Sequence, residues 1–215
     1  MSTPAEVSFG LAAIFAVISW VGVTLGVRPL EYLGKPLTML CLAVAAAFLK
    51  PGAEPVHWTI VGGLLLGGLG DVLLMTAQKV TGRALSAFLA GHLAYILAFT
   101  AQRQNLPALI AAGLVCLAVI LIYQRWLLAG LRASGREHLI RPVLIYMIVI
   151  GAMTATACGT LNPLAAAGAV LFFASDGLFA WYHFVGPLRW GRPANIVLYQ
   201  CGQGLIAASL ALAST

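Results

Sequence analysis

The sequence predicts an all-α fold, a polytopic transmembrane helical bundle of about eight helices that forms a single domain over residues 1–215. Hydrophobic residues make up 61% of the chain and charged residues only 8%, and the mean hydropathy is +0.98. Soluble domains carry about 25% charged residues, so this composition excludes a soluble protein. The 215 residues divide into apolar runs close to the roughly 20 residues that a membrane-crossing helix needs.

Eight apolar runs, separated by glycine, proline, asparagine or charged residues, are each predicted to form one helix. The predicted spans are residues 7–27, 33–50, 57–77, 83–101, 106–128, 139–158, 162–184 and 194–213. No basic residue precedes the first run, Phe9–Val27, and no small-residue cleavage site stands out. We therefore expect a retained span rather than a signal peptide.

Basic residues are distributed unevenly between the two sides of the predicted bundle. One side receives only Lys50 and Arg103. The other receives Arg28, Lys35, Lys79, Arg83, Arg125, Arg132, Arg136, Arg141, Arg189 and Arg192. Basic loops stay in the cytoplasm, so both termini are predicted to lie on the non-cytoplasmic side of a bacterial inner membrane. The net charge of +6 then reflects topology, and no nucleic-acid partner is expected.

The only two aspartates of the chain fall deep in predicted helices. Asp71 lies in the run Val61–Met75 and Asp176 in the run Ala169–Trp181. A carboxylate at mid-membrane costs roughly 2.5–3.5 kcal/mol on insertion scales, so intramembrane carboxylates usually serve a function. Each lies about 14 residues, or roughly 21 Å, into a helix that runs inward, which predicts both in the cytoplasmic half.

Polar side chains of other helices are expected in the same layer, because those helices begin at the cytoplasmic side and carry polar residues early. His92 and Tyr95 share one helix face, and Asn195, Tyr199 and Gln203 share another. The complete predicted site has Asp71 and Asp176 as catalytic residues and, around the substrate, Lys35, Thr38, His92, Tyr95, Tyr146, Asn195, Tyr199 and Gln203.

Small residues lead to both aspartates. Gly63, Gly67 and Gly70 lie on the side of the third predicted helix that carries Asp71, and Gly168 and Ser175 precede Asp176 in the same way. Small residues let a neighbouring backbone approach closely, so both carboxylates should face the bundle rather than lipid. The third and fourth predicted helices resemble the seventh and eighth, because each pair has a small-residue span with an aspartate followed by a span with a polar stripe. This similarity leaves open a parallel duplication of four helices plus four.

Two carboxylates at one depth can divide the roles of acid and base, because burial and mutual repulsion act on each differently. The alternatives are that they pin helices as hydrogen-bond acceptors or pair with Lys35, which could itself reach the membrane interface.

A metal site would have only Asp71, Asp176 and His92 as ligands, so no metal is predicted. Neither a G-x-S-x-G motif nor a cofactor fingerprint is present, so no cofactor is expected. The four cysteines lie in apolar runs and are expected to pack there.

Five short motifs carry a family resemblance. They read Lys35-Pro36-Leu37-Thr38-Met39, Gly70-Asp71-Val-Leu-Leu-Met75, Phe88-x-x-Gly91-His92-x-x-Tyr95, Gly168-Ala169-x-x-Phe172-x-x-Ser175-Asp176 and Tyr199-x-x-Gly202-Gln203-x-Leu205-Ile206. Together they resemble the YhhN/lysoplasmalogenase family of integral membrane proteins, in the expected order and over nearly the whole chain. The resemblance implies an ether hydrolase that splits the vinyl ether bond of lysoplasmalogens into a fatty aldehyde and glycerophosphoethanolamine or glycerophosphocholine. It also implies that Asp71 and Asp176 are the catalytic pair and that no organic cofactor takes part.

The chemistry of this reaction suits an aspartate pair. A vinyl ether is cleaved by protonation of its β-carbon, and water adds to the resulting oxocarbenium ion, which a carboxylate stabilises as in glycosidases. The expected partners are a lysophospholipid substrate, water and membrane lipids. Two other classes stay open: a proton-coupled transporter or channel that uses the aspartates as relay sites, and a lipid-binding protein without turnover. The outer halves of the last three predicted helices offer almost no hydrophilic path, which disfavours transport.

Overall fold

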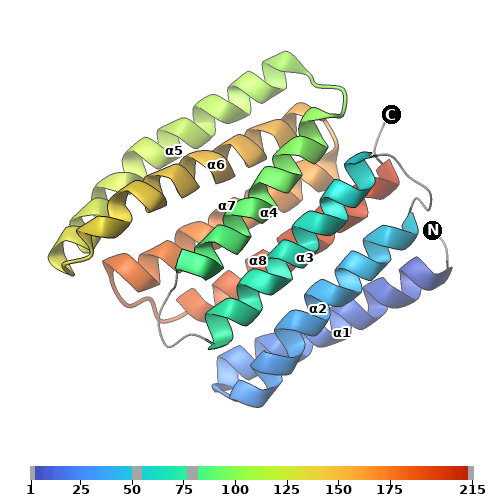
Figure 1. The fold of residues 1–215 in the computed structure, drawn as a ribbon, viewed down its shortest axis with the longest axis horizontal. Coiled ribbons are helices and arrows are strands. Elements are labelled where there is room, and N and C mark those ends of the chain that lie inside the picture. Colours follow the sequence, from blue (N-terminus) through green and yellow to red (C-terminus); the bar gives the residue numbers. More distant parts are fainter. Residues whose placement is uncertain (1–2, 50–54, 77–81, 213–215) are drawn as a thin grey trace.

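The computed structural model describes residues 3–49, 55–76 and 82–212, and Figure 1 shows them as a bundle of long helices. The helices are α1 (Thr3–Leu25), α2 (Arg28–Leu49), α3 (Pro55–Thr76), α4 (Gly82–Thr100), α5 (Leu106–Ala133), α6 (Ile140–Gly159), α7 (Pro163–Ala180) and α8 (Gly191–Ser209). Short helical turns precede α6 at Glu137–Leu139, follow α7 at Trp181–Val185 and follow α8 at Leu210–Leu212. Within the described residues, eight helical segments are long and apolar enough to cross a membrane, which confirms the predicted fold class.

The largest differences from the predicted spans are in α2 and α5. The α2 helix begins at Arg28, five residues before the predicted start at residue 33, and continues through Pro36. Proline costs one backbone hydrogen bond inside a helix, but membrane helices tolerate it when neighbouring helices pack around it. The α5 helix continues to Ala133, five residues past the predicted end. The predicted ends at residues 50, 77 and 213 lie outside the described part of the chain.

The helices form four hairpins, and a ring of five helices lies at the centre of the bundle. The ring is closed by contacts between α3 and α4, α4 and α6, α6 and α7, α7 and α8, and α8 and α3. Helices α1 and α2 flank the ring on one side and α5 packs on α6 at the other (Figure 1). The site described below is built from this ring together with the second half of α5 and Lys35 of α2.

Both termini lie at one end of the bundle, and the α1–α2, α5–α6 and α7–α8 connections lie at the other (Figure 1). We call the second end the basic end, because it carries most of the arginines that the structure describes, whereas Arg103 follows α4 at the opposite end. Lys50 and Lys79, which entered the predicted charge count, lie outside the described residues. The cytoplasmic location of the basic end stays a prediction.

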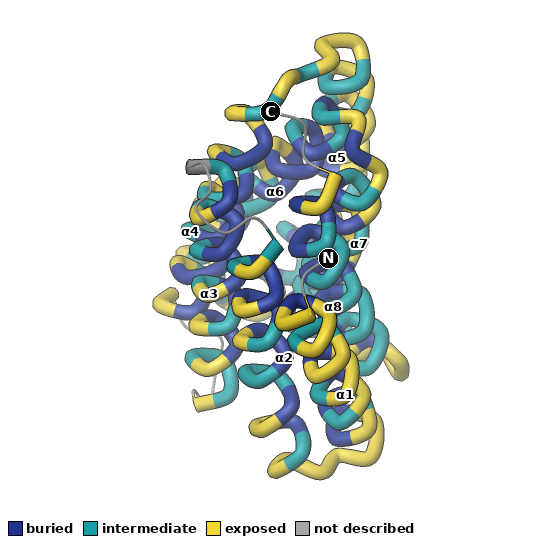
Figure 2. The backbone as a smooth tube through the Cα atoms, turned by 90° about the vertical axis from the view of Figure 1, so that its right-hand side faces the viewer, coloured by how far each residue is buried: buried dark blue, intermediate teal, exposed yellow. Residues whose placement is uncertain are grey.

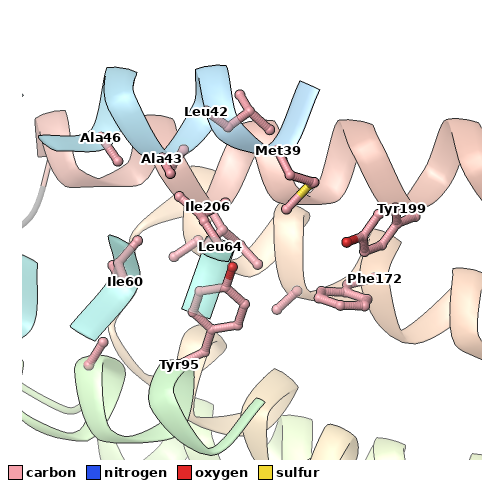
Figure 3. Close-up of a cluster of buried hydrophobic side chains, with 14 of the residues drawn as sticks. Met39, Leu42, Ala43, Ala46, Ile60, Leu64, Tyr95, Phe172, Tyr199 and Ile206 are labelled. Carbon is pink, nitrogen blue, oxygen red and sulfur yellow. The ribbon is translucent and has the colours of Figure 1, made fainter. Parts of the chain in front are cut away.

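The outer faces of the bundle are apolar and exposed, as a lipid-facing surface requires. In α1 the exposed Val7, Leu11, Ile14 and Val21 recur with helical spacing. Figure 2 shows that exposed stretches follow the outer helices, α1 among them. The inner faces meet in a buried core. Figure 3 shows part of it, with Met39, Leu42, Ala43 and Ala46 of α2, Ile60 and Leu64 of α3, Tyr95 of α4, Phe172 of α7, and Tyr199 and Ile206 of α8.

Glycines set the close approach of helices around the core. A Cβ atom added at Gly168 of α7 would lie 2.7 Å from the carbonyl oxygen of Gly202 in α8, and one added at Gly202 would lie 2.8 Å from the carbonyl oxygen of Gly168. Side chains at either position would push the two backbones apart. The small residues before Asp176 therefore serve helix packing, as the sequence predicted.

Candidate active site

A cavity of about 790 Å³ lies in the half of the bundle nearest the basic end. Its walls come from the end of α3, the start of α4, the second half of α5, the first half of α6, the end of α7 and the start of α8. Most of the lining is apolar, and the predicted site residues that reach it are Lys35, Asp71, Tyr146, Asp176, Asn195 and Tyr199. The structure thus brings the two aspartates of α3 and α7 to one cavity.

Asp176 lies in a hydrogen-bond network that joins three helices. The Tyr146 hydroxyl donates to Asp176 Oδ2 at 2.6 Å, and His92 Nε2 lies 3.3 Å from the same oxygen and 3.0 Å from the Tyr146 hydroxyl oxygen. His92 is fully buried behind the cavity, whereas the Asp176 side chain is 19% exposed. Two groups that can donate a hydrogen bond therefore face Asp176 Oδ2, an arrangement that stabilises negative charge on this oxygen.

Asp71 has a different environment from Asp176. The residue is only 5% exposed, and its Oδ2 atom makes no hydrogen bond within the described part of the chain. Its polar neighbour is the Tyr199 hydroxyl of α8. This hydroxyl fits against α3 because residue 67 is glycine: a Cβ atom there would lie 3.0 Å from the Tyr199 oxygen and 2.9 Å from Gln203 Nε2.

Four predicted site residues do not line the cavity. His92 contacts it only through Asp176 and Tyr146. The Tyr95 hydroxyl donates to Gln203 Oε1 at 2.6 Å, so these two bind each other one layer deeper in the core. The Thr38 hydroxyl donates to the backbone oxygen of Gly34 at 2.7 Å and is buried within α2.

One buried charged residue next to the cavity-lining Lys35 is absent from the predicted site. Glu31 is buried in α2, where Lys35 Nζ lies 2.8 Å from its Oε1 atom and Arg192 Nη2 lies 2.9 Å from its Oε2 atom. Glu31 falls in the predicted connection between the spans 7–27 and 33–50, whereas the structure places it in the first turn of α2. The four-residue spacing of Glu31 and Lys35 was the signal that could have revealed the pair.

The residues considered for other chemistries can be located among the described residues. These residues contain no group of three or more His, Cys, Asp or Glu side chains placed to hold a metal ion. The Ser175 hydroxyl donates to the backbone oxygen of Phe172 at 2.7 Å, which is a helix-internal contact rather than a nucleophile's arrangement. Lys35 pairs with Glu31 and not with either aspartate.

Comparison with known proteins gives relatives over most of the chain. Lysoplasmalogenase TMEM86B of Mus musculus is 29% identical over 192 residues, which cover 89% of this chain and 76% of the mouse protein. A lysoplasmalogenase of Mycobacterium tuberculosis is 33% identical over 184 residues, which cover 77% of this chain and 67% of that protein. Lysoplasmalogenase TMEM86B of Homo sapiens is 30% identical over 176 residues, which cover 81% of this chain and 73% of the human protein. No solved structure matches the chain.

The family comparison agrees with the motifs and with the fold. The model of the YhhN family matches residues 30–210, from the first turn of α2 to the end of α8. This range includes both aspartates and every wall of the cavity. The chain belongs to the YhhN family.

Proposed function

We propose that this protein is a membrane-embedded hydrolase that cleaves the vinyl ether bond of lysoplasmalogens. The observation that carries the proposal is that Asp71 and Asp176 line one largely apolar cavity. The relatives named lysoplasmalogenase support the same reaction. The whole chain acts as one domain, in the inner membrane of a bacterium with the basic end in the cytoplasm.

The cavity suits a single-chain lipid. Its volume of about 790 Å³ lies within the range of roughly 300–1,000 Å³ that small-molecule sites occupy. Val119, Ile145 and Val170 line it and are exposed, so they can contact an alkenyl chain that enters from the bilayer. Lys35 and Asn195 line it near the basic end, where the headgroup of a membrane lipid is located.

The two carboxylates take different roles because their environments differ. Asp71, which lacks a hydrogen-bond donor on Oδ2, is the general acid and carries the proton in the resting enzyme. Asp176, which faces the Tyr146 hydroxyl and His92, is the carboxylate that stabilises the cation and accepts a proton. This division resembles that of glycosidases, in which two carboxyl groups flank an oxocarbenium ion.

Each aspartate gives up one proton and takes up one proton during the proposed reaction. Asp71 protonates the β-carbon of the vinyl ether, and the α-carbon becomes an oxocarbenium ion. Water adds to the α-carbon while Asp176 takes one of its protons, which gives a hemiacetal. The hemiacetal hydroxyl returns a proton to Asp71 and Asp176 protonates the glycerol oxygen as the carbon–oxygen bond breaks. A fatty aldehyde and a glycerophospho-alcohol leave, and both aspartates regain their starting states.

The test is turnover of a synthetic lysoplasmalogen by the purified protein. Asp71→Asn and Asp176→Asn keep size and hydrogen-bonding capacity but remove the titrating group, so each should lower turnover by about 10²-fold or more. In deuterated water, aldehyde that is reduced as it forms should carry one deuterium beside the former carbonyl carbon. In ¹⁸O water the label should enter the aldehyde and not the glycerol.

A saturated ether lysolipid is the matched control, because it has no double bond to protonate and should bind and inhibit without being cleaved. Its cleavage, or ¹⁸O in the glycerol product, would refute the mechanism. Full activity in both Asn variants would leave the carboxylates a structural role only. Proton flux through reconstituted vesicles without any aldehyde release would instead favour the transporter.

A further inference from the structure

We propose that Lys35 and Arg192, held together by Glu31, bind the phosphate group of the lysophospholipid. The inference rests on the proposed function and identifies the part of the substrate that this side-chain cluster recognises. We call Glu31, Lys35 and Arg192 the phosphate cluster. None of these residues takes part in the acid–base chemistry described above.

The geometry of the cluster places two cations side by side. Lys35 Nζ lies 2.8 Å and Arg192 Nη2 lies 3.1 Å from the same atom, Oε1 of Glu31. Arg192 Nη2 also donates to Oε2 at 2.9 Å. Because both nitrogens contact one oxygen, their separation cannot exceed the sum of the first two distances. Two oxygens of a single phosphate can bridge cations at this spacing.

Both cations keep donors for a ligand. An ammonium group has three donors and a guanidinium five, and the contacts to Glu31 use one nitrogen of each. The Arg192 side chain is 58% exposed, whereas the Glu31 side chain is 8% exposed. The carboxylate is therefore buried as a support, and the cluster presents a net positive charge of one to an anion.

The cluster is connected to the reacting groups along two helices. Lys35 lines the same cavity as Asp71. On α8, Arg192, Asn195 and Tyr199 follow helical spacing, and Asn195 and Tyr199 also line the cavity. From Arg192 to Tyr199 the helix rises about 10 Å at 1.5 Å per residue, so one side of α8 leads from the phosphate cluster to the cavity.

The cluster recognises phosphate rather than the amine of the headgroup. Both Glu31 oxygens already accept hydrogen bonds from cations, so this carboxylate has little capacity left for an ammonium group. We therefore expect ethanolamine and choline lysolipids to be bound through the same contacts. Arginine is well suited to this role, because its planar guanidinium matches the geometry of phosphate oxygens.

The test compares three alkenyl substrates in the same detergent micelles: the ethanolamine and choline lysoplasmalogens and the phosphate-free 1-O-alkenylglycerol. Arg192→Gln should raise KM about tenfold for both phospholipids, which corresponds to about 1.4 kcal/mol, and leave KM for the alkenylglycerol unchanged. Arg189→Gln is the matched control, since Arg189 lies over the Trp190 ring and outside the cluster. It should change none of the three values.

Equal losses on all three substrates would show that Arg192 only ties α8 to α2, and they would overturn the proposal. Hydrolysis of the alkenylglycerol by Arg192→Gln reports that the variant is folded. Lys35→Met provides a second variant, with the same expected difference between phospholipid and phosphate-free substrate. A shift in KM for only one of the two headgroups would also contradict recognition of the phosphate.

Binding measurements separate this inference from the proposed reaction. A saturated ether lysophospholipid should bind the wild-type protein about tenfold more tightly than Arg192→Gln even if no substrate is hydrolysed. Equal affinities would refute the phosphate cluster whatever the activity. Inorganic phosphate is the probe for a soluble ligand. If inorganic phosphate displaced the bound saturated ether lysophospholipid more strongly than the lysolipid itself does, free phosphate would replace the lipid headgroup as the ligand of the phosphate cluster.

Discussion

Asp71 and Asp176 are the same residue type in two hydrogen-bond environments. Asp176 faces the Tyr146 hydroxyl and His92 Nε2, and Asp71 packs beside the Tyr199 hydroxyl in a site made by the missing side chain of Gly67. A buried carboxylate is stabilised as an anion only where donors point at it. In the proposed mechanism, the residues around each aspartate, rather than the aspartates themselves, therefore divide the roles of acid and base.

The Tyr146→Phe variant tests the donor to Asp176. Removal of the hydroxyl deletes a 2.6 Å hydrogen bond and leaves the ring in place. Hydrogen bonds to charged groups contribute about 1.5–3 kcal/mol, so turnover should fall by about 10- to 100-fold. The measurement is kcat for aldehyde release by the purified variant.

Tyr32→Phe is the control for this experiment, because the Tyr32 hydroxyl donates to the backbone oxygen of Met75 at an exposed position outside the cavity. It should retain wild-type turnover. A Tyr146→Phe enzyme as fast as wild type would show that Asp176 needs no donor from α6.

At the scale of helices, close packing between α7 and α8 holds Asp176 and Tyr199 in the wall of one cavity. The approach is limited by backbone atoms, since the Gly168 and Gly202 positions face each other's carbonyl oxygens. Backbone cannot rotate away as a side chain can. Packing at this contact should therefore tolerate no added methyl group.

We expect Gly168→Ala to lower the thermal midpoint of unfolding in detergent, with a destabilisation of about 1–3 kcal/mol. The new Cβ atom would lie 2.7 Å from the Gly202 carbonyl oxygen and would force the helices apart. Gly62→Ala makes the same change of residue type in a helix where no atom lies within 4 Å of the added group. Its midpoint should stay the same or rise, and an equal fall in both variants would contradict the packing argument.

For the molecule as a whole, an even number of spanning helices puts both termini at one end and the arginine-rich connections at the other. The positive-inside rule predicts that the basic end, which carries the phosphate cluster, lies in the cytoplasm. The substrate headgroup would enter from the cytoplasmic leaflet.

A reporter that is active only in the cytoplasm tests this orientation. Fused after the last residue it should give no signal, because the C-terminus is predicted to lie outside. Inserted between α5 and α6, at Ser134–Arg136, it should give a strong signal. The reverse pattern would place the cavity in the other half of the membrane.

Insensitivity to chelators is a second expectation for the whole enzyme. The proposed mechanism uses two carboxylates and water, so a strong chelator should leave turnover unchanged. Turnover in the presence and absence of the chelator is the measurement. Loss of activity that zinc restores would replace the mechanism with a metal site built on His92, Asp71 and Asp176.

The sequence alone determined the class of fold, the number of spans and the shared helix face of polar stripes such as His92 and Tyr95. These properties follow from the bilayer acting as solvent: the free energy of inserting a segment depends on its own composition, and the 3.6-residue period fixes its faces. The stripe with His92 and Tyr95 is buried as predicted, and Gly63, Gly67 and Gly70 face neighbouring helices.

Only the tertiary structure decided which of these faces meet. His92 and Asp176 are 84 residues apart, and Glu31 and Arg192 are 161 residues apart, so no local pattern could pair them. The continuation of α2 through Pro36, which makes Glu31 a helix residue, also depends on the helices that pack around it. The rotation and partner of each helix are set by close packing between segments, and this packing energy is absent from the composition of any single span.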